Sequence, residues 1–286
     1  MSVLFSEYEK MTNVSSRFDK FVQFLAQLPS EVWRATVTEE PEWKWMRPLS
    51  ETWKFGHFAA LFIVLGLNDY QTKGKADVGY WPKVVPLIPR QSDPKNPLQL
   101  IDILKPFYSR ERFAQTKLKR LERFVRSDLC HTIWVSNSAL IAAGFGQIWQ
   151  SLAGTMDQQP TKKTIAFAMK CLALALLMVD ETRFDFSAIP VPVDSRIRSV
   201  SDRLSLPSAH EATERERWRG ALDRIQQSHP EITMVHLDSL LWQIGTLSPQ
   251  AMEVHLRKLG AGSLASRISG LFGAVDIPNS RGHACT

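Results

Sequence analysis

The chain has 286 residues, of which 44% are apolar, so it is long enough for one large folded domain or two small ones that share a core. Its formal net charge of +6 is compatible with a polyanionic partner but does not prove one, because net charge governs association and not fold. Cys130, Cys171 and Cys285 lack metal-ligand spacing and cannot all pair with one another. This favours free thiols in a reducing cytoplasm.

The longest apolar stretch runs from Ile165 to Val179, and Lys170 interrupts it. Because its 15 residues fall short of the roughly 20 that cross a bilayer, we interpret it as a buried central helix. The N-terminal region is polar and charged from Ser6 to Lys20, which argues against a signal peptide. We therefore expect a soluble, cytoplasmic protein that makes no membrane contact.

Helical periodicity extends along nearly the whole chain, and the fold class that it predicts is all-α. Residues 18–25 place their apolar side chains on one face, residues 58–67 form a buried helix, and residues 111–127 alternate basic with apolar positions at helical spacing. Gly154 to Pro160 is predicted to be a polar hairpin between two helices. Further helices are expected over 138–152, 163–182, 195–204, 212–228, 236–246 and 248–259.

Lys163 is the first candidate for chemistry, within Lys162-Lys163-Thr164 at the start of the central helix. A lysine in the first turn of a helix is usually an ordinary solvated side chain. However, a polar hairpin precedes this one, the helix is otherwise apolar, and Lys170 follows seven residues later in the same facial register. The positive end of a helix also disfavours an ammonium, which frees the amine for attack. Lys170 either extends out of the core or belongs to the same site.

Asp194 follows the stiff segment Ile189-Pro190-Val191-Pro192-Val193 and precedes a predicted helix, which is typical of an N-cap residue. Most such residues only cap. A carboxylate held by backbone N–H groups nevertheless stays ionised and fixed in direction, so it can also stabilise a positively charged sugar. An amine with a nearby carboxylate is the pair needed to cut a glycosidic C–N bond through a Schiff base.

Asp238 and Trp242 are four residues apart, which places them on one face of a predicted helix. An amphipathic helix with a half-buried tryptophan also explains this spacing. Because Asp238 falls on the apolar side, its carboxylate is expected to have a partner or a ligand. Such a pair can hydrogen-bond to, and stack on, a base taken out of a duplex.

These motifs, in this order and with these gaps, resemble the archaeal 8-oxoguanine DNA glycosylases, a branch of the helix-hairpin-helix glycosylase superfamily. The resemblance is strongest over about residues 161–245. It implies one glycosylase domain over residues 1–286, with an N-terminal lobe of about 1–110 and a C-terminal lobe of about 111–286 around one cleft.

The resemblance also implies roles for individual residues. Lys163 would be the nucleophile that attacks the sugar, and Asp194 would assist it. The pocket for the flipped base would be lined by Asp238, Trp242, Lys170, Trp81 and Glu42. The DNA backbone would be contacted by Lys162, Thr164 and Arg196.

Glu42 departs from the family pattern, in which a glutamine reads the base edge. A carboxylate only accepts hydrogen bonds, so Glu42 favours a base edge with an exposed amine, as in cytosine. Two targets therefore stay open: an 8-oxoguanine-like base, and a bulky modified base of invading viral DNA.

The function that we expect is a monomeric DNA glycosylase, with abasic-site lyase activity through the Schiff base, acting on double-stranded DNA that contains a modified base. No cofactor and no metal are expected. Two alternatives remain: a helical DNA-binding protein without catalytic activity, and a helical interaction protein with no nucleic-acid role.

Overall fold

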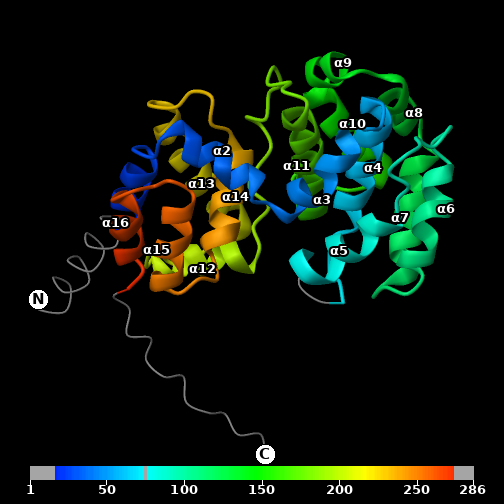
Figure 1. Cartoon of the computed structure of the whole chain (residues 1–286). Coiled ribbons are helices and arrows are strands. Elements are labelled where there is room, and N and C mark those ends of the chain that lie inside the picture. The colour runs from blue at the N-terminus through cyan, green and yellow to red at the C-terminus, as the bar shows by residue number, and fades with distance from the viewer. Residues whose placement is uncertain (1–16, 74–75, 274–286) are drawn as a thin grey trace, which may run out of the picture. The chain divides into compact units, whose positions relative to one another are not determined.

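All regular elements are helices in the computed structural model, which describes residues 17–73 and 76–273 (Figure 1). The all-α prediction is therefore confirmed. None of the described helices is long and apolar enough to cross a membrane. Of the cysteines, Cys130 and Cys171 are free and buried, whereas Cys285 lies outside the described residues, as does the segment before residue 17.

The chain divides into two compact units built from interleaved segments. The larger unit contains residues 34–192 and 233–239, and the smaller unit contains residues 1–33, 193–232 and 240–286. Neither unit is a continuous half of the chain. The smaller unit needs the start of the chain because Phe18 and Phe21 pack edge-on against Trp218, and Phe21 also packs against Phe272.

Two apolar helices, α4 (Phe55–Asn68) and α11 (Lys163–Met178), form the core of the larger unit. Nearly all of their side chains are buried, as expected for helices that are apolar on every face. They pack against each other more extensively than any other pair. The other helices of this unit are α3 (Pro41–Ser50), η1 (Ala76–Tyr80), α5 (Trp81–Val84), η2 (Val85–Leu87), α6 (Gln99–Tyr108), α7 (Ala114–Val125), α8 (Asp128–Val135), α9 (Ser138–Ala143) and α10 (Phe145–Met156).

The smaller unit is also helical. Residues 17–25 form its first helix, in which Phe21, Val22 and Leu25 are buried. Two helices contain residues of both units, α2 (Ser30–Thr38) and α14 (Met234–Ile244). The other helices of the smaller unit are α12 (Ser195–Arg203), α13 (Glu211–Gln226), α15 (Pro249–Lys258) and α16 (Leu264–Gly270).

The turn between α10 and α11 fixes where the central helix begins. The hairpin predicted from Gly154 starts later, because α10 continues to Met156 and ends where Asp157 adopts a left-handed conformation with φ 51°. The indole of Trp149 donates a hydrogen bond to the carbonyl of Pro160 at 2.9 Å. The hydroxyl of Thr164 donates to Oε1 of Gln158 at 2.8 Å. These bonds fasten the turn to both helices.

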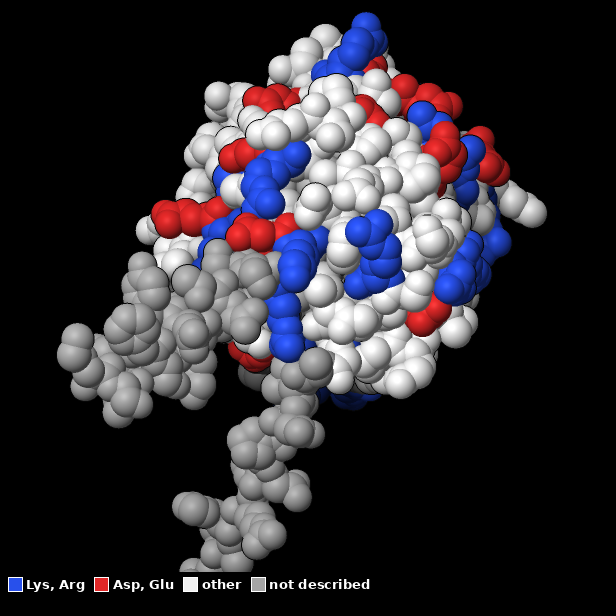
Figure 2. All heavy atoms as spheres, turned by 90° about the vertical axis from the view of Figure 1, so that its left-hand side faces the viewer, with Lys and Arg blue, Asp and Glu red and all other residues white. Residues whose placement is uncertain are grey.

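Charged side chains are mixed on the surface. On the face drawn in Figure 2, Lys and Arg form separate groups between Asp, Glu and broad uncharged areas. In the smaller unit, Arg224 pairs with Asp19 at 2.6 Å and Arg257 pairs with Glu253 at 2.7 Å. The basic face predicted over residues 111–127 has one exception, because Lys117 is fully buried.

Candidate functional site

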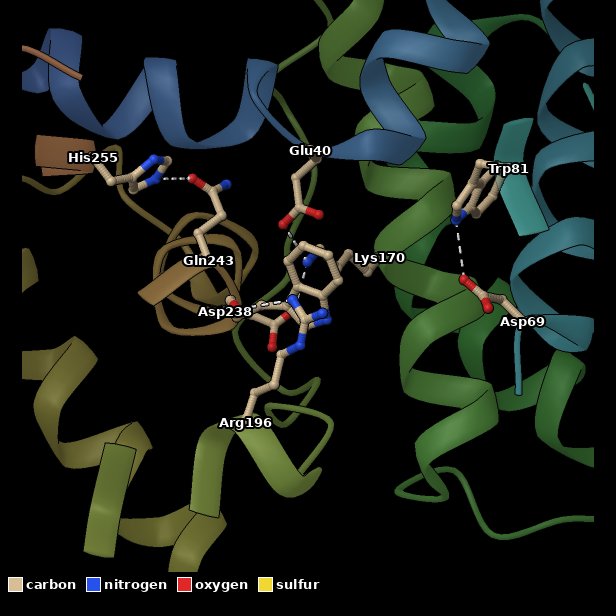
Figure 3. Close-up of polar contacts among 9 residues, drawn as sticks. Glu40, Asp69, Trp81, Lys170, Arg196, Asp238, Gln243 and His255 are labelled. Atoms are coloured by element: carbon tan, nitrogen blue, oxygen red, sulfur yellow. Dashed lines mark hydrogen bonds and ion pairs between the residues drawn. The ribbon is translucent and has the colours of Figure 1, made fainter. Parts of the chain in front are cut away.

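Lys170 lies in the middle of α11, and its ammonium group is buried. Its Nζ is 2.6 Å from Oδ2 of Asp238 and 2.9 Å from Oε1 of Glu40, and both carboxylates are buried as well (Figure 3). Burial alone lowers the pKa of Lys170, but Asp238, Glu40 and Glu42 outweigh it and hold the pKa above its usual value. Lys170 therefore stays charged inside the core and does not extend into solvent.

Glu42, in the first turn of α3, is the fourth member of this group, which we call the carboxylate–lysine cluster (Glu40, Glu42, Lys170 and Asp238). Burial raises the pKa of Glu42 well above its usual range, and the charge and hydrogen bond of Glu40 raise it further, although Lys170 lowers it. Glu42 therefore favours its protonated form more than an exposed glutamate does. A protonated carboxyl both donates and accepts hydrogen bonds, whereas the sequence predicts an acceptor at this position.

Trp81 and Asp69 form a second polar contact in the larger unit. Trp81 is fully buried, and its Nε1 donates a hydrogen bond to Oδ2 of Asp69 at 3.0 Å (Figure 3). Burial raises the pKa of Asp69 to about 7, while the Trp81 hydrogen bond and the charges of Lys117 and Lys163 lower it. The charge of Asp69 in turn raises the pKa of Glu42. Asp69 thus links Lys163 electrostatically to the carboxylate–lysine cluster.

Lys163 is the first residue of α11 and Lys162 is its N-cap. Both lysine side chains are exposed, whereas Thr164 behind them is half-buried and holds the turn. The predicted start of the central helix is therefore confirmed. Within the larger unit, the structure brings five of the sequence-predicted site residues into one electrostatic network: Lys163, Lys170, Asp238, Glu42 and Trp81.

The Pro-x-Pro segment begins beside this network. Pro190 and Pro192, together with Lys170 and Asp238, line a narrow hollow that has no room for a water molecule. The prolines restrict the backbone to extended conformations, so the direction in which the chain leaves the hollow is fixed by few rotatable bonds.

Three predicted site residues belong to the smaller unit. Asp194 caps α12, because its Oδ1 accepts hydrogen bonds from the backbone N–H groups of Arg196 at 2.8 Å and Ile197 at 3.0 Å. The N-cap prediction is therefore confirmed. The guanidinium carbon of Arg196 lies 3.6 Å from the ring centroid of Trp242, and its Nη1 donates to the carbonyl of Trp242 at 3.2 Å. Arg196 thus covers one face of a half-buried indole.

Sequence reasoning missed Glu40 and Asp69. Glu40 stands immediately before the proline that opens α3, and Asp69 immediately follows the last residue of α4. Polar residues at helix ends are common, so neither position carries a local signal of its buried partner. Among the described residues, no group of three or more His, Cys, Asp or Glu side chains is arranged to hold a metal ion.

Comparison with known proteins agrees with this fold. The model of a family described as AGOG, N-glycosylase/DNA lyase, matches residues 22–267. The crystal structure of an 8-oxoguanine DNA glycosylase from Pyrobaculum aerophilum, in complex with 8-oxoguanosine, has a similar fold with a TM-score of 0.68. That match has 18% sequence identity and covers 91% of this chain and 98% of the other. None of the curated protein sequences matches.

Proposed function

Because the chain belongs to the AGOG family of N-glycosylase/DNA lyases, we propose that it flips a modified base out of a DNA duplex and removes it with Lys163 as the nucleophile. The observation that carries this proposal is the electrostatic network of the larger unit. It joins Lys163 through Asp69 to Glu42, and Glu42 to Lys170. An exposed amine beside a buried group of donors and acceptors suits attack on a sugar whose base is held nearby.

The reaction follows from the amine. The lone pair of the Lys163 Nζ forms a bond to the sugar C1′, and the glycosidic C–N bond breaks, so that its electron pair leaves with the base. The N–H proton of the adduct passes to the ring oxygen as the C1′–O4′ bond breaks, so the sugar opens to a Schiff base with a free 4′ hydroxyl. Loss of a proton from C2′ then expels the 3′ phosphate by β-elimination and cuts the strand. Asp194, fixed in direction by its cap, stabilises the positive charge that develops on the sugar.

The base is held by stacking and by the carboxylate–lysine cluster. Trp242, whose half-buried indole is contacted by Arg196, is the first stacking residue that we propose, because stacking on an indole accepts any flat base. Trp81, which is fully buried, is the second stacking residue that we propose. Lys162, Thr164 and Arg196 contact the phosphate backbone, where positive charge attracts DNA without regard to sequence.

We propose an 8-oxoguanine-like base as the substrate. Such a base presents N–H donors and carbonyl acceptors on one edge, and the cluster offers both kinds of partner. Protonated Glu42 and Lys170 donate, while Asp238 accepts. The structural relative was crystallised with 8-oxoguanosine, which agrees with this choice. A bulky modified base of viral DNA is the alternative substrate, and the trapping assay described below can be run with duplexes that contain it.

Borohydride trapping tests the nucleophile. Wild-type protein should form a covalent adduct with a duplex that contains 8-oxoguanine and with a duplex that contains an abasic site. Lys163→Ala should abolish both adducts while DNA affinity changes only a few-fold, because the amine is one of several charges. Lys162→Ala, the neighbouring exposed lysine, is the matched control and should retain trapping. Trapping that survives Lys163→Ala would refute the mechanism, and a reversed result for the two lysines would move the nucleophile to Lys162.

A further inference from the structure

Glu40 and Glu42 flank Pro41, and the side chains of both are buried. Burial and the neighbouring Glu40 raise the pKa of Glu42 well above its usual range, whereas the charge of Lys170 lowers it. The Lys170 Nζ lies 2.9 Å from Oε1 of Glu40. Glu42 therefore favours its protonated form more than an ordinary glutamate does.

One oxygen of Glu42 is left open. Its Oε2 has no hydrogen-bond partner among the described residues, although the residue is only 2% exposed. A buried carboxyl oxygen without a partner is costly, and such groups are found where a ligand completes them. Because Glu42 interacts electrostatically with both Asp69 and Lys170, this open oxygen belongs to the proposed base-binding network and not to a separate site.

We propose that Glu42 is a catalytic acid that protonates the departing base. This inference rests on the proposed function, in which Lys163 displaces the base from C1′. A base that leaves as an anion is a poor leaving group. Transfer of the Glu42 proton to the base gives a neutral product, and the electron pair of the broken C–N bond stays on the base. Glu42 is then a carboxylate beside Glu40 and regains a proton from water before the next turnover.

Three charged groups act on the proton of Glu42, each from a different element. Glu40, before α3, and Asp69, after α4, stabilise the protonated form, whereas Lys170 on α11 destabilises it. Burial raises the pKa of the Cys171 thiol, also on α11, well above its usual value. The balance raises the pKa of Glu42, so this side chain keeps its proton to a higher pH than an ordinary glutamate does. It also predicts that base release slows as alkaline pH removes that proton, while strand cleavage at an abasic site lacks this step.

The test compares two single-turnover rate constants, release of 8-oxoguanine from a duplex and cleavage of a duplex that already contains an abasic site. Glu42→Gln keeps the size and polarity of the side chain but cannot give up a proton. We expect Glu42→Gln to lower the ratio of the base-release rate to the abasic-cleavage rate on the order of 10²-fold.

The pH profile is a second measurement. In Glu42→Gln, the rate of base release should no longer fall as the pH becomes alkaline. Glu42→Asp, which keeps an ionisable acid, should retain that fall. Glu39→Gln, in the adjacent exposed ion pair with Lys44, is the matched control and should resemble wild type.

The outcomes separate this inference from the proposed function. If Glu42→Gln releases the base as fast as wild type, or slows both reactions equally, Glu42 is not the acid. If wild-type protein neither cleaves abasic DNA nor forms the borohydride adduct, the lysine mechanism itself fails. Melting temperatures of all variants show whether a lost rate reflects lost folding.

Discussion

Gly66 on α4 meets Cys171 on α11 so closely that a Cβ at position 66 would lie 2.8 Å from the Cys171 Sγ and 2.9 Å from the Cα of Ala168. Only a glycine permits this approach, because the second contact is to backbone and cannot rotate away. Lys163, Asp69 and Lys170 all lie on or beside these two helices. The close approach therefore sets the spacing of the network as well as the packing of the core.

Gly66→Ala should therefore destabilise the protein by about 1–3 kcal/mol through overpacking. Gly154→Ala is the control, because a Cβ on this exposed helical glycine of α10 would contact nothing within 4 Å. It should be neutral or stabilise by about 0.5–1 kcal/mol, as alanine favours the helix. Urea unfolding measures both. Equal stability of the two variants would mean that α4 and α11 can separate at no cost.

Lys170→Met should cost about 3–5 kcal/mol of unfolding free energy, since it leaves the carboxylates of Asp238 and Glu40 buried without their cation. Lys44→Met removes an ion pair whose lysine side chain is 51% exposed, and it should change stability by less than about 1 kcal/mol. Equal losses in the two variants would argue against a buried charge cluster.

Asp194→Asn should keep the cap of α12 but lose base excision, because asparagine caps helices about as well yet carries no charge. Asp194→Ala should lose excision and also about 1 kcal/mol of stability. Ser248→Ala removes the cap of α15 in the same unit, where the hydroxyl accepts from the N–H of Ala251 at 3.2 Å. This control should lose similar stability and retain activity. If Asp194→Asn excises the base as well as the wild type does, Asp194 only caps α12 and has no catalytic role.

Asp69→Asn should change how stability depends on pH. Because burial raises the pKa of Asp69 to about 7, the folded chain holds a proton between about pH 4 and pH 7 that the unfolded chain has lost. The contribution of this proton is complete below that window and disappears as pH rises through 7. The unfolding free energy of Asp69→Asn relative to wild type should therefore rise over this window, while the exposed Asp102→Asn should show no such trend. Denaturant unfolding at a series of pH values decides between them.

Local physics explains which parts of this molecule its sequence predicts. The apolar stretch from Ile165 to Val179, which only Lys170 interrupts, predicts a buried helix. Asp194, directly before Ser195, is predicted to be an N-cap wherever the helix that it opens lies. The need of Asp238 for a partner also follows from its position on an apolar face. Helix ends are less predictable. The helix expected over 163–182 stops at Met178, because Asp180 adopts a left-handed conformation with φ 57°.

Contacts between residues far apart in the sequence have no comparable local sequence pattern. Glu40 and Lys170 are 130 residues apart in the chain, and no periodicity in either segment indicates that they meet. The raised pKa of Glu42 cannot be predicted from the sequence either, because it depends on burial and on the positions of Glu40 and Asp69. Sequence thus identifies the groups that carry chemistry, whereas their charge states emerge only from the packed structure.

The interleaved segments also set an order of assembly. A chain that emerges from the ribosome holds every residue of the larger unit once residue 239 has been added, and that unit can begin to fold. The helix over residues 17–25 is synthesised early but must wait, because Phe21 is covered by Trp218 and then by Phe272, near the other end of the chain. An apolar helix face therefore stays exposed through most of synthesis, and it is there that a nascent chain is most open to chaperones or to premature association.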